Sequence, residues 1–166
     1  MKAIKKILVP TDLSEFSLAA VEYAASLAEM YGAKIYMLYV TDGEPNLAFP
    51  TVDRHSETIP RDSEGEAKKQ LHHFVYGNVI QVRNVPEIVR VGKAQVEIPR
   101  FATEAGIDLI VMATHGRTGF AHILMGSVAE KVVRTSSVPV MTIKPRELQS
   151  VLVTEEDIEK DLHLKG

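Results

Sequence analysis

Short apolar runs rich in β-branched residues alternate along this chain with longer stretches of helical periodicity. The runs at 34–40 and 108–112 are almost uninterrupted, which is typical of strands buried on both faces of a sheet. Between the runs, apolar residues such as Leu18, Val21 and Ala25 recur every three or four positions, as on one face of a helix. This alternation predicts βαβ units in an α/β three-layer sandwich, with a parallel sheet between two layers of helices.

The expected elements follow from this pattern and from the residues that interrupt it. Pro10 is expected to end the first strand, because proline cannot donate to a central ladder. Ser14 is expected to cap the next helix, and Pro99 either delays the start of a later helix to about Glu97 or kinks it. We expect strands at Ile4 to Val9, Lys34 to Val40, Asp108 to Met112 and Val138 to Ile143, extended residues at 79–85 and 87–91, and helices at 15–31, 63–76, 94–104 and 127–135.

Length and composition narrow the class of protein. A chain of 166 residues is the size of one domain, expected at 1–146, with 147–166 as a C-terminal extension carrying a short strand and helix. Without cysteine there is no disulfide framework, thiol nucleophile or thiolate metal site. The net charge of -3 gives no general attraction for nucleic acid or a membrane surface. The first apolar run is too short for a signal peptide or a membrane span, so we expect a cytoplasmic protein.

A glycine-containing loop after the run at 108–112 has the composition of an anion site. It reads Ala113-Thr-His-Gly116, then nine residues (117–125), then Gly126-Ser127 at the start of a helix. Glycine lets backbone N–H groups approach an anion, and a helix N-terminus offers unpaired N–H groups. Gly116, Gly126 and Ser127 are therefore expected to contact phosphate. The alternative is an ordinary strand-to-helix loop with a capping serine.

Three charged or titratable side chains are further candidates, each with a plainer alternative. Asp12, after the first strand, is placed to accept a hydrogen bond from a ribose hydroxyl or to help hold Mg²⁺, or else to cap the next helix with Ser14. Arg117 suits phosphate oxygens but is equally a solvated loop residue. His115 has no accompanying nucleophile or acidic pair, so a structural histidine is the favoured interpretation.

Two further observations argue against a metal site on a helix and against two common nucleotide-binding loops. His72 and His73 are adjacent on a predicted helix and cannot face one metal ion, because ligand pairs on a helix are three or four residues apart. The chain also contains neither a Walker loop nor a G-x-G-x-x-G loop after its first strand.

Together the segments Val9-Pro10-Thr11-Asp12, Met112 to Gly116, Gly126 to Glu130 and Ser137 to Val140 closely resemble the universal stress protein family, in particular its ATP-binding branch. The family signature is a glycine, two residues, a glycine, nine residues, then Gly-Ser or Gly-Thr. Ala113 stands at the first glycine, which excludes conformations that only glycine adopts.

The resemblance implies a Rossmann-like sheet of the adenine nucleotide alpha hydrolase type, five-stranded, mostly parallel, in strand order 3-2-1-4-5. It also implies ATP or another adenine nucleotide, with Mg²⁺ at Asp12 as an option, and a homodimer along Val138 to Ile143. The residues carried over as binding residues are Pro10, Thr11, Asp12, Val40, Met112, Ala113, His115, Gly116, Arg117, Gly126, Ser127, Val128 and Ala129.

Three functions remain open at this point. The favoured one is a nucleotide-dependent regulatory module active under stress. The second is a slow ATPase or phosphotransferase in which Asp12 orients metal or water. The third is a dimeric protein that regulates partners without binding nucleotide tightly.

Overall fold

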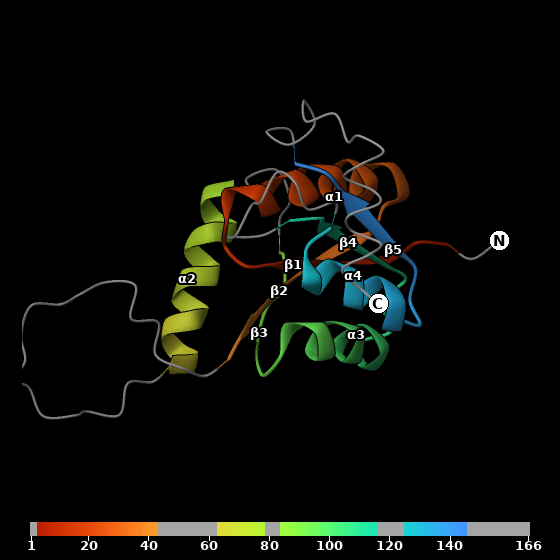
Figure 1. Ribbon diagram of the computed structural model, residues 1–166. Helices are drawn as coiled ribbons and strands as arrows, with labels where there is room; N and C mark the ends of the chain where they lie inside the picture. The colour runs from red at the N-terminus through yellow and green to blue at the C-terminus, as the bar shows by residue number, and fades with distance from the viewer. Residues whose placement is uncertain (1–2, 43–62, 79–83, 116–124, 146–166) are drawn as a thin grey trace, which may run out of the picture.

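The computed structural model describes residues 3–42, 63–78, 84–115 and 125–145, and its strands form a single parallel sheet in the order β3-β2-β1-β4-β5 (Figure 1). The predicted fold class and strand order are therefore confirmed. The predicted extension, 147–166, lies outside the described residues. The elements are β1 (Lys6–Thr11), η1 (Glu15–Ser17), α1 (Leu18–Tyr31), β2 (Lys34–Thr41), α2 (Ser63–Asn78), β3 (Glu87–Val91), α3 (Ala94–Glu104), β4 (Leu109–Ala113), α4 (Ser127–Thr135) and β5 (Val140–Ile143).

Helices cover both faces of the sheet, with α1 and α2 on one side and α3 and α4 on the other (Figure 1). Alternate residues of β1 divide between the two cores: Ile7 packs with α1 and α2, and Leu8 packs with α3 and α4. Both side chains are fully buried. Burying a side chain of this size stabilises the fold by about 1.5–3 kcal/mol, which explains why the strand sequences are apolar without alternation.

The first strand does not end at Pro10, as the sequence had predicted, but continues to Thr11 in register with β2. The Lys5 carbonyl accepts from Lys34 of β2, whereas the Lys6 carbonyl accepts from Asp108, so odd residues of β1 bond towards β2 and even residues towards β4. The backbone nitrogen of Pro10 therefore faces β4 and has no hydrogen to donate to that strand. The β1–β4 ladder stops at Leu8, before that position, while the β1–β2 ladder is unaffected.

The first helix also begins later than predicted. A 3-10 turn, η1, precedes α1, which starts at Leu18, and Ser14 makes no side-chain capping bond to either helix. Its hydroxyl instead donates to Asp12, which holds the polypeptide in a turn before the helix can start. Gly32 ends α1 in the left-handed conformation at φ 64°, as the sequence predicts.

Helix α3 has its predicted bounds without the late start considered for it, whereas the boundary of β5 differs from the prediction. Helix α3 begins at Ala94, because the N–H groups of Val96 and Glu97 already donate to the Lys93 carbonyl, and it contains Pro99 in its interior. The late start is therefore wrong, and burial of the α3 face compensates for the lost hydrogen bond. Strand β5 begins two residues later than predicted, whereas α4 has its predicted bounds. Among the helices described, none has the length and hydropathy needed to cross a bilayer.

Candidate functional site

Strands β1 and β4 separate at the carboxyl edge of the sheet. Their ladder ends at Leu8 and Ile110, yet β1 continues to Thr11 beside β2 and β4 continues to Ala113 beside β5. The strand order reverses between these two strands, and ligands of open parallel sheets bind at such a point. The missing donor of Pro10 therefore contributes directly to opening the site.

A cavity of about 350 Å³ occupies this crevice on the side of α3 and α4. The structure brings nearly all of the predicted site residues together there, while Gly116 and Arg117 lie outside the described residues. The predicted residues that line the cavity are Pro10, Thr11, Asp12, Val40, Met112, Ala113, His115, Gly126, Ser127, Val128 and Ala129; Ser17, Leu38, Ala94, Ile98 and Thr114 line it as well.

One part of the wall is apolar and comes from β2, α3 and β4. Leu38 and Ile98 are almost completely buried, and Met112 is nearly so. Sequence reasoning assigned no site role to Leu38 or Ile98. The period of a strand places Leu38 on the same face as Val40, so Leu38 could have been found from that predicted neighbour, whereas Ile98 lies on a helix for which no site residue was predicted.

Another part of the wall is the N-terminus of α4. The first hydrogen bond of this helix runs from the Glu130 N–H to the Gly126 carbonyl, so the N–H groups of Ser127, Val128 and Ala129 precede it. Within the described ranges no group accepts a hydrogen bond from these three donors. Three convergent N–H groups at a helix N-terminus attract an anion through both hydrogen bonding and the helix dipole.

Gly126 itself has a different role from the predicted one. Its N–H donates to the Thr114 carbonyl at 2.7 Å, so it is not directed at an anion. A Cβ at position 126 would lie 3.0 Å from that same carbonyl oxygen. A side chain here would therefore force a shift of a few tenths of an ångström, and the hydrogen bond ties the start of α4 to the end of β4.

Asp12 lies at the cavity with its carboxylate oriented by the following turn. Its Oδ1 accepts hydrogen bonds from the Ser14 N–H at 3.1 Å and from the Ser14 hydroxyl at 2.5 Å. Asp12 thus orders the turn before η1 and does not cap a helix with Ser14, which was the plainer alternative, and it remains in the cavity wall. Within the described residues no group of three or more His, Cys, Asp or Glu side chains is placed to hold a metal ion.

The family model described as the universal stress protein family matches residues 3–144, which span the whole described fold. The chain belongs to the universal stress protein family. Universal stress protein MJ0531 of Methanocaldococcus jannaschii is 35% identical over 143 residues, which cover 84% of this chain and 82% of that protein. MJ0577 of the same organism is 29% identical over 154 residues, covering 84% and 94%.

Solved structures of similar proteins agree with the fold. The structure of MJ0577 superposes with a TM-score of 0.67 at 26% identity, covering 87% of this chain and 99% of that one. A universal stress protein of Archaeoglobus fulgidus, solved in complex with dAMP, superposes with a TM-score of 0.61 at 22% identity, covering 87% and 100%. The latter likeness establishes the shared fold.

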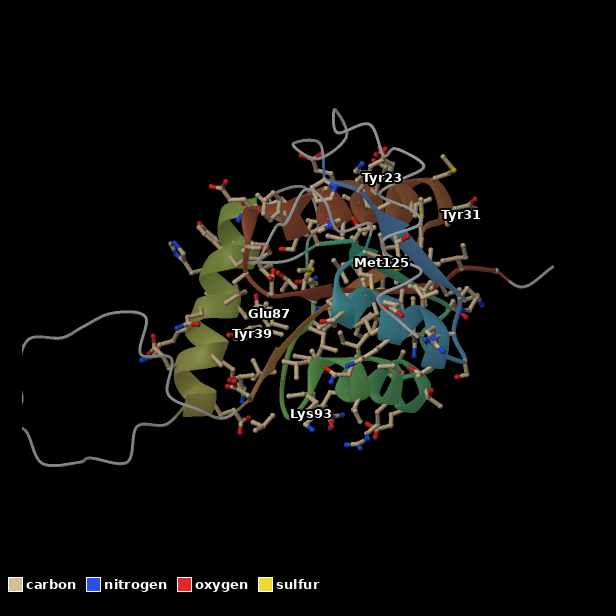
Figure 2. All side chains as sticks on the ribbon, viewed as in Figure 1. Tyr23, Tyr31, Tyr39, Glu87, Lys93 and Met125 are labelled. Carbon is tan, nitrogen blue, oxygen red and sulfur yellow. The ribbon has the colours of Figure 1, made fainter. Side chains whose placement is uncertain are left out.

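In this universal stress protein the departure at Ala113 causes no backbone strain. The residue ends β4, pairs with Ile143 and has no positive φ, so the position does not need glycine here. His115 is buried, with Nδ1 2.9 Å from the Thr114 hydroxyl oxygen. His72 lies away from the cavity lining: its Nδ1 is 3.0 Å from Oε1 of Glu87. Glu87 is a residue of β3 and is labelled beside α2 in Figure 2.

Proposed function

We propose that this universal stress protein binds an adenine nucleotide, ATP in particular, and acts as a nucleotide-dependent regulatory module. One observation supports this most strongly: the same cavity has an apolar wall and the first three N–H groups of α4, which have no acceptor among the described residues. The dAMP complex is a property of the Archaeoglobus fulgidus protein and does not by itself show binding by this chain. The proposal rests on the residues of this chain.

The chemistry of the cavity matches the three parts of a nucleotide. Its volume lies within the range of about 300–1,000 Å³ usual for ligand sites. Leu38, Val40 and Ile98 offer apolar surface to a base, and the N–H groups of 127–129 offer donors to phosphate. Asp12 lies between β1 and the η1 turn, where its carboxylate is placed to accept from a ribose hydroxyl.

Magnesium fits this arrangement as a companion of the nucleotide rather than as a resident ion. Mg²⁺ is commonly held by one or two carboxylates together with substrate phosphates and water. Asp12 supplies one such carboxylate at the cavity wall. Bound Mg²⁺ would neutralise phosphate charge, and the protein's own part would be the Asp12 carboxylate and the donors of α4.

Binding without efficient turnover is favoured by the titratable groups of the cavity. Among the described residues that line it, these are Asp12 and His115, and both are hydrogen-bonded within the protein. A general base must reach the proton that it removes, and Asp12 Oδ1 is already occupied by two donors from Ser14.

We further propose that the protein forms a homodimer through β5, within the predicted segment 138–143. The Pro139 and Ile143 carbonyls accept from β4, so the alternate residues Val140 and Thr142 direct their backbone groups to the outer edge. In the described part of the chain, no strand pairs with this edge. An open edge strand is a template for pairing with another chain, here a second copy.

The proposal is tested by calorimetric titration of the purified protein with ATP, AMP, adenosine and GTP. We expect ATP and AMP to bind more tightly than adenosine, because only the phosphates use the α4 donors. GTP should bind more weakly than ATP. Absence of binding at millimolar ATP would refute the proposal.

A further inference from the structure

Two buried hydroxyl groups lie side by side in the cavity wall, and both are hydrogen-bonded within the protein. Thr11 and Ser17 are 7% and 3% exposed, and their hydroxyl oxygens are 2.8 Å apart. Thr11 ends β1, whereas Ser17 is the last residue of η1. The pair therefore connects the carboxyl end of the central strand to the start of the first helix.

The direction of each hydrogen bond follows from the partners. The Ser17 hydroxyl contacts the Ser14 carbonyl at 2.7 Å, and because a carbonyl only accepts, Ser17 donates its proton there. Ser17 has no second proton, so the Thr11 hydroxyl must donate to Ser17. Thr11 in turn accepts from the Leu13 N–H at 2.9 Å. The result is a one-way relay from Leu13 through Thr11 and Ser17 to Ser14.

This relay surrounds a strained residue. Leu13 has a φ of 66°, the left-handed region, which costs a residue with a Cβ about 1–2 kcal/mol. Leu13 keeps this conformation while its N–H is bonded to Thr11 and its side chain packs against the core of α1 and α2. Strained backbone held by surrounding bonds is characteristic of functional sites.

Asp12 lies inside the relay, between Thr11 and Leu13. Its carboxylate is oriented by Ser14, and the Ser14 carbonyl is the acceptor at the end of the relay. The conformation at Leu13 therefore sets where the Asp12 carboxylate lies relative to the cavity.

We propose that Ser17 is a positioning residue of the nucleotide site. It acts through Thr11 and Leu13 to hold the Asp12 carboxylate where a ribose hydroxyl binds. This inference rests on the proposed function, and it adds a residue that the family signature of the loop at 113–127 does not include.

The test compares Ser17→Ala with the control Ser26→Ala, whose hydroxyl donates to the Glu22 carbonyl on the exposed side of α1. In the nucleotide-free protein, Ser17→Ala should accelerate amide exchange at Leu13 by about 2- to 10-fold, because the relay loses its acceptor. Calorimetry should show AMP affinity reduced by a similar factor. Ser26→Ala should change neither quantity.

A double-mutant cycle with Leu13→Gly separates positioning from general destabilisation. Glycine adopts φ 66° without strain, so the Ser17→Ala effect on AMP affinity should be smaller in the Leu13→Gly background. Thermal melts of all four proteins show that each is folded during the titration.

The outcomes are distinguishable. A wild-type protein that binds neither AMP nor ATP refutes the proposed function and, with it, any role of Ser17 in binding. Where the wild type binds, unchanged AMP affinity in Ser17→Ala refutes the positioning role alone. So does a Ser17→Ala effect of the same size in both backgrounds.

Discussion

Replacing Gly126 with alanine is the sharpest perturbation of the proposed phosphate site, because the added methyl group meets backbone rather than a flexible side chain. The new Cβ would lie 3.0 Å from the Thr114 carbonyl oxygen, the same atom that accepts the 2.7 Å bond from the Gly126 N–H. The start of α4 must then move away from the end of β4. The three N–H groups that follow Gly126 move with it.

Two magnitudes follow from this displacement. Weakening one backbone hydrogen bond lowers the free energy of unfolding by about 0.5–1.5 kcal/mol, or a few degrees in the melting temperature. Interaction of an anion with a helix N-terminus contributes about 0.3–2 kcal/mol, so losing it weakens AMP binding by about 2- to 30-fold. Adenosine lacks the phosphate and should bind with little change.

Calorimetric titration with AMP and with adenosine measures both parts of this prediction. Gly77→Ala is the matched control, because a Cβ there meets nothing within 4 Å. Gly77 lies in α2, and no residue of α2 lines the cavity. It should leave both affinities unchanged and stabilise the helix by up to about 1 kcal/mol. Equal AMP affinity in Gly126→Ala and Gly77→Ala would refute the reasoning, as would equal losses for AMP and adenosine in Gly126→Ala.

Three further predictions address the other claims. Asp12→Asn keeps an acceptor for Ser14 but loses the charge, so AMP affinity should fall about 5-fold. Phosphate release from ATP should stay at the level of buffer alone in both the wild type and this variant. Release above that level in the wild type, reduced in the variant, would favour the ATPase. Thr142→Pro removes an outward N–H of β5 without touching the bonds to β4, and sedimentation should show monomers; a persistent dimer would contradict pairing through β5. Deletion of 147–166 should leave the dimer intact, and a monomeric truncated protein would assign association to the extension.

The architecture was predictable because periodicity reports burial directly. Strands covered on both faces must be apolar throughout, and this feature alone indicated a parallel sheet covered by helices. The bounds of α4 were also predictable, since Gly126-Ser127 marks its start. The strand order came from the family resemblance, because periodicity does not specify which strands are neighbours.

The errors have specific physical causes. Pro10 was expected to stop β1, but a strand has two edges and the missing donor affects only the edge towards β4. The Gly126 N–H was expected to face phosphate, but a tertiary contact with the Thr114 carbonyl uses it. Both outcomes depend on which neighbour a backbone group faces, which local sequence does not encode.

The site residues that were missed show the same limit. Leu38 and Ile98 look like ordinary core residues in the sequence, and they reach the cavity only because β2 and α3 meet beside it. Ser17 looked like a position within the first helix. The 3-10 turn before α1 brings it back to Thr11, and no periodic pattern predicts such a turn.

The central claim is that an adenine nucleotide binds at the carboxyl edge of the sheet between β1 and β4. It is tested most directly by backbone amide chemical shifts recorded as ATP is added to the isotope-labelled protein. The account predicts the largest changes at Ser127, Val128 and Ala129, with further changes at Asp12 and Val40. Saturating ATP that leaves these amides unshifted, or that shifts residues on the face of α1 and α2 instead, would contradict it.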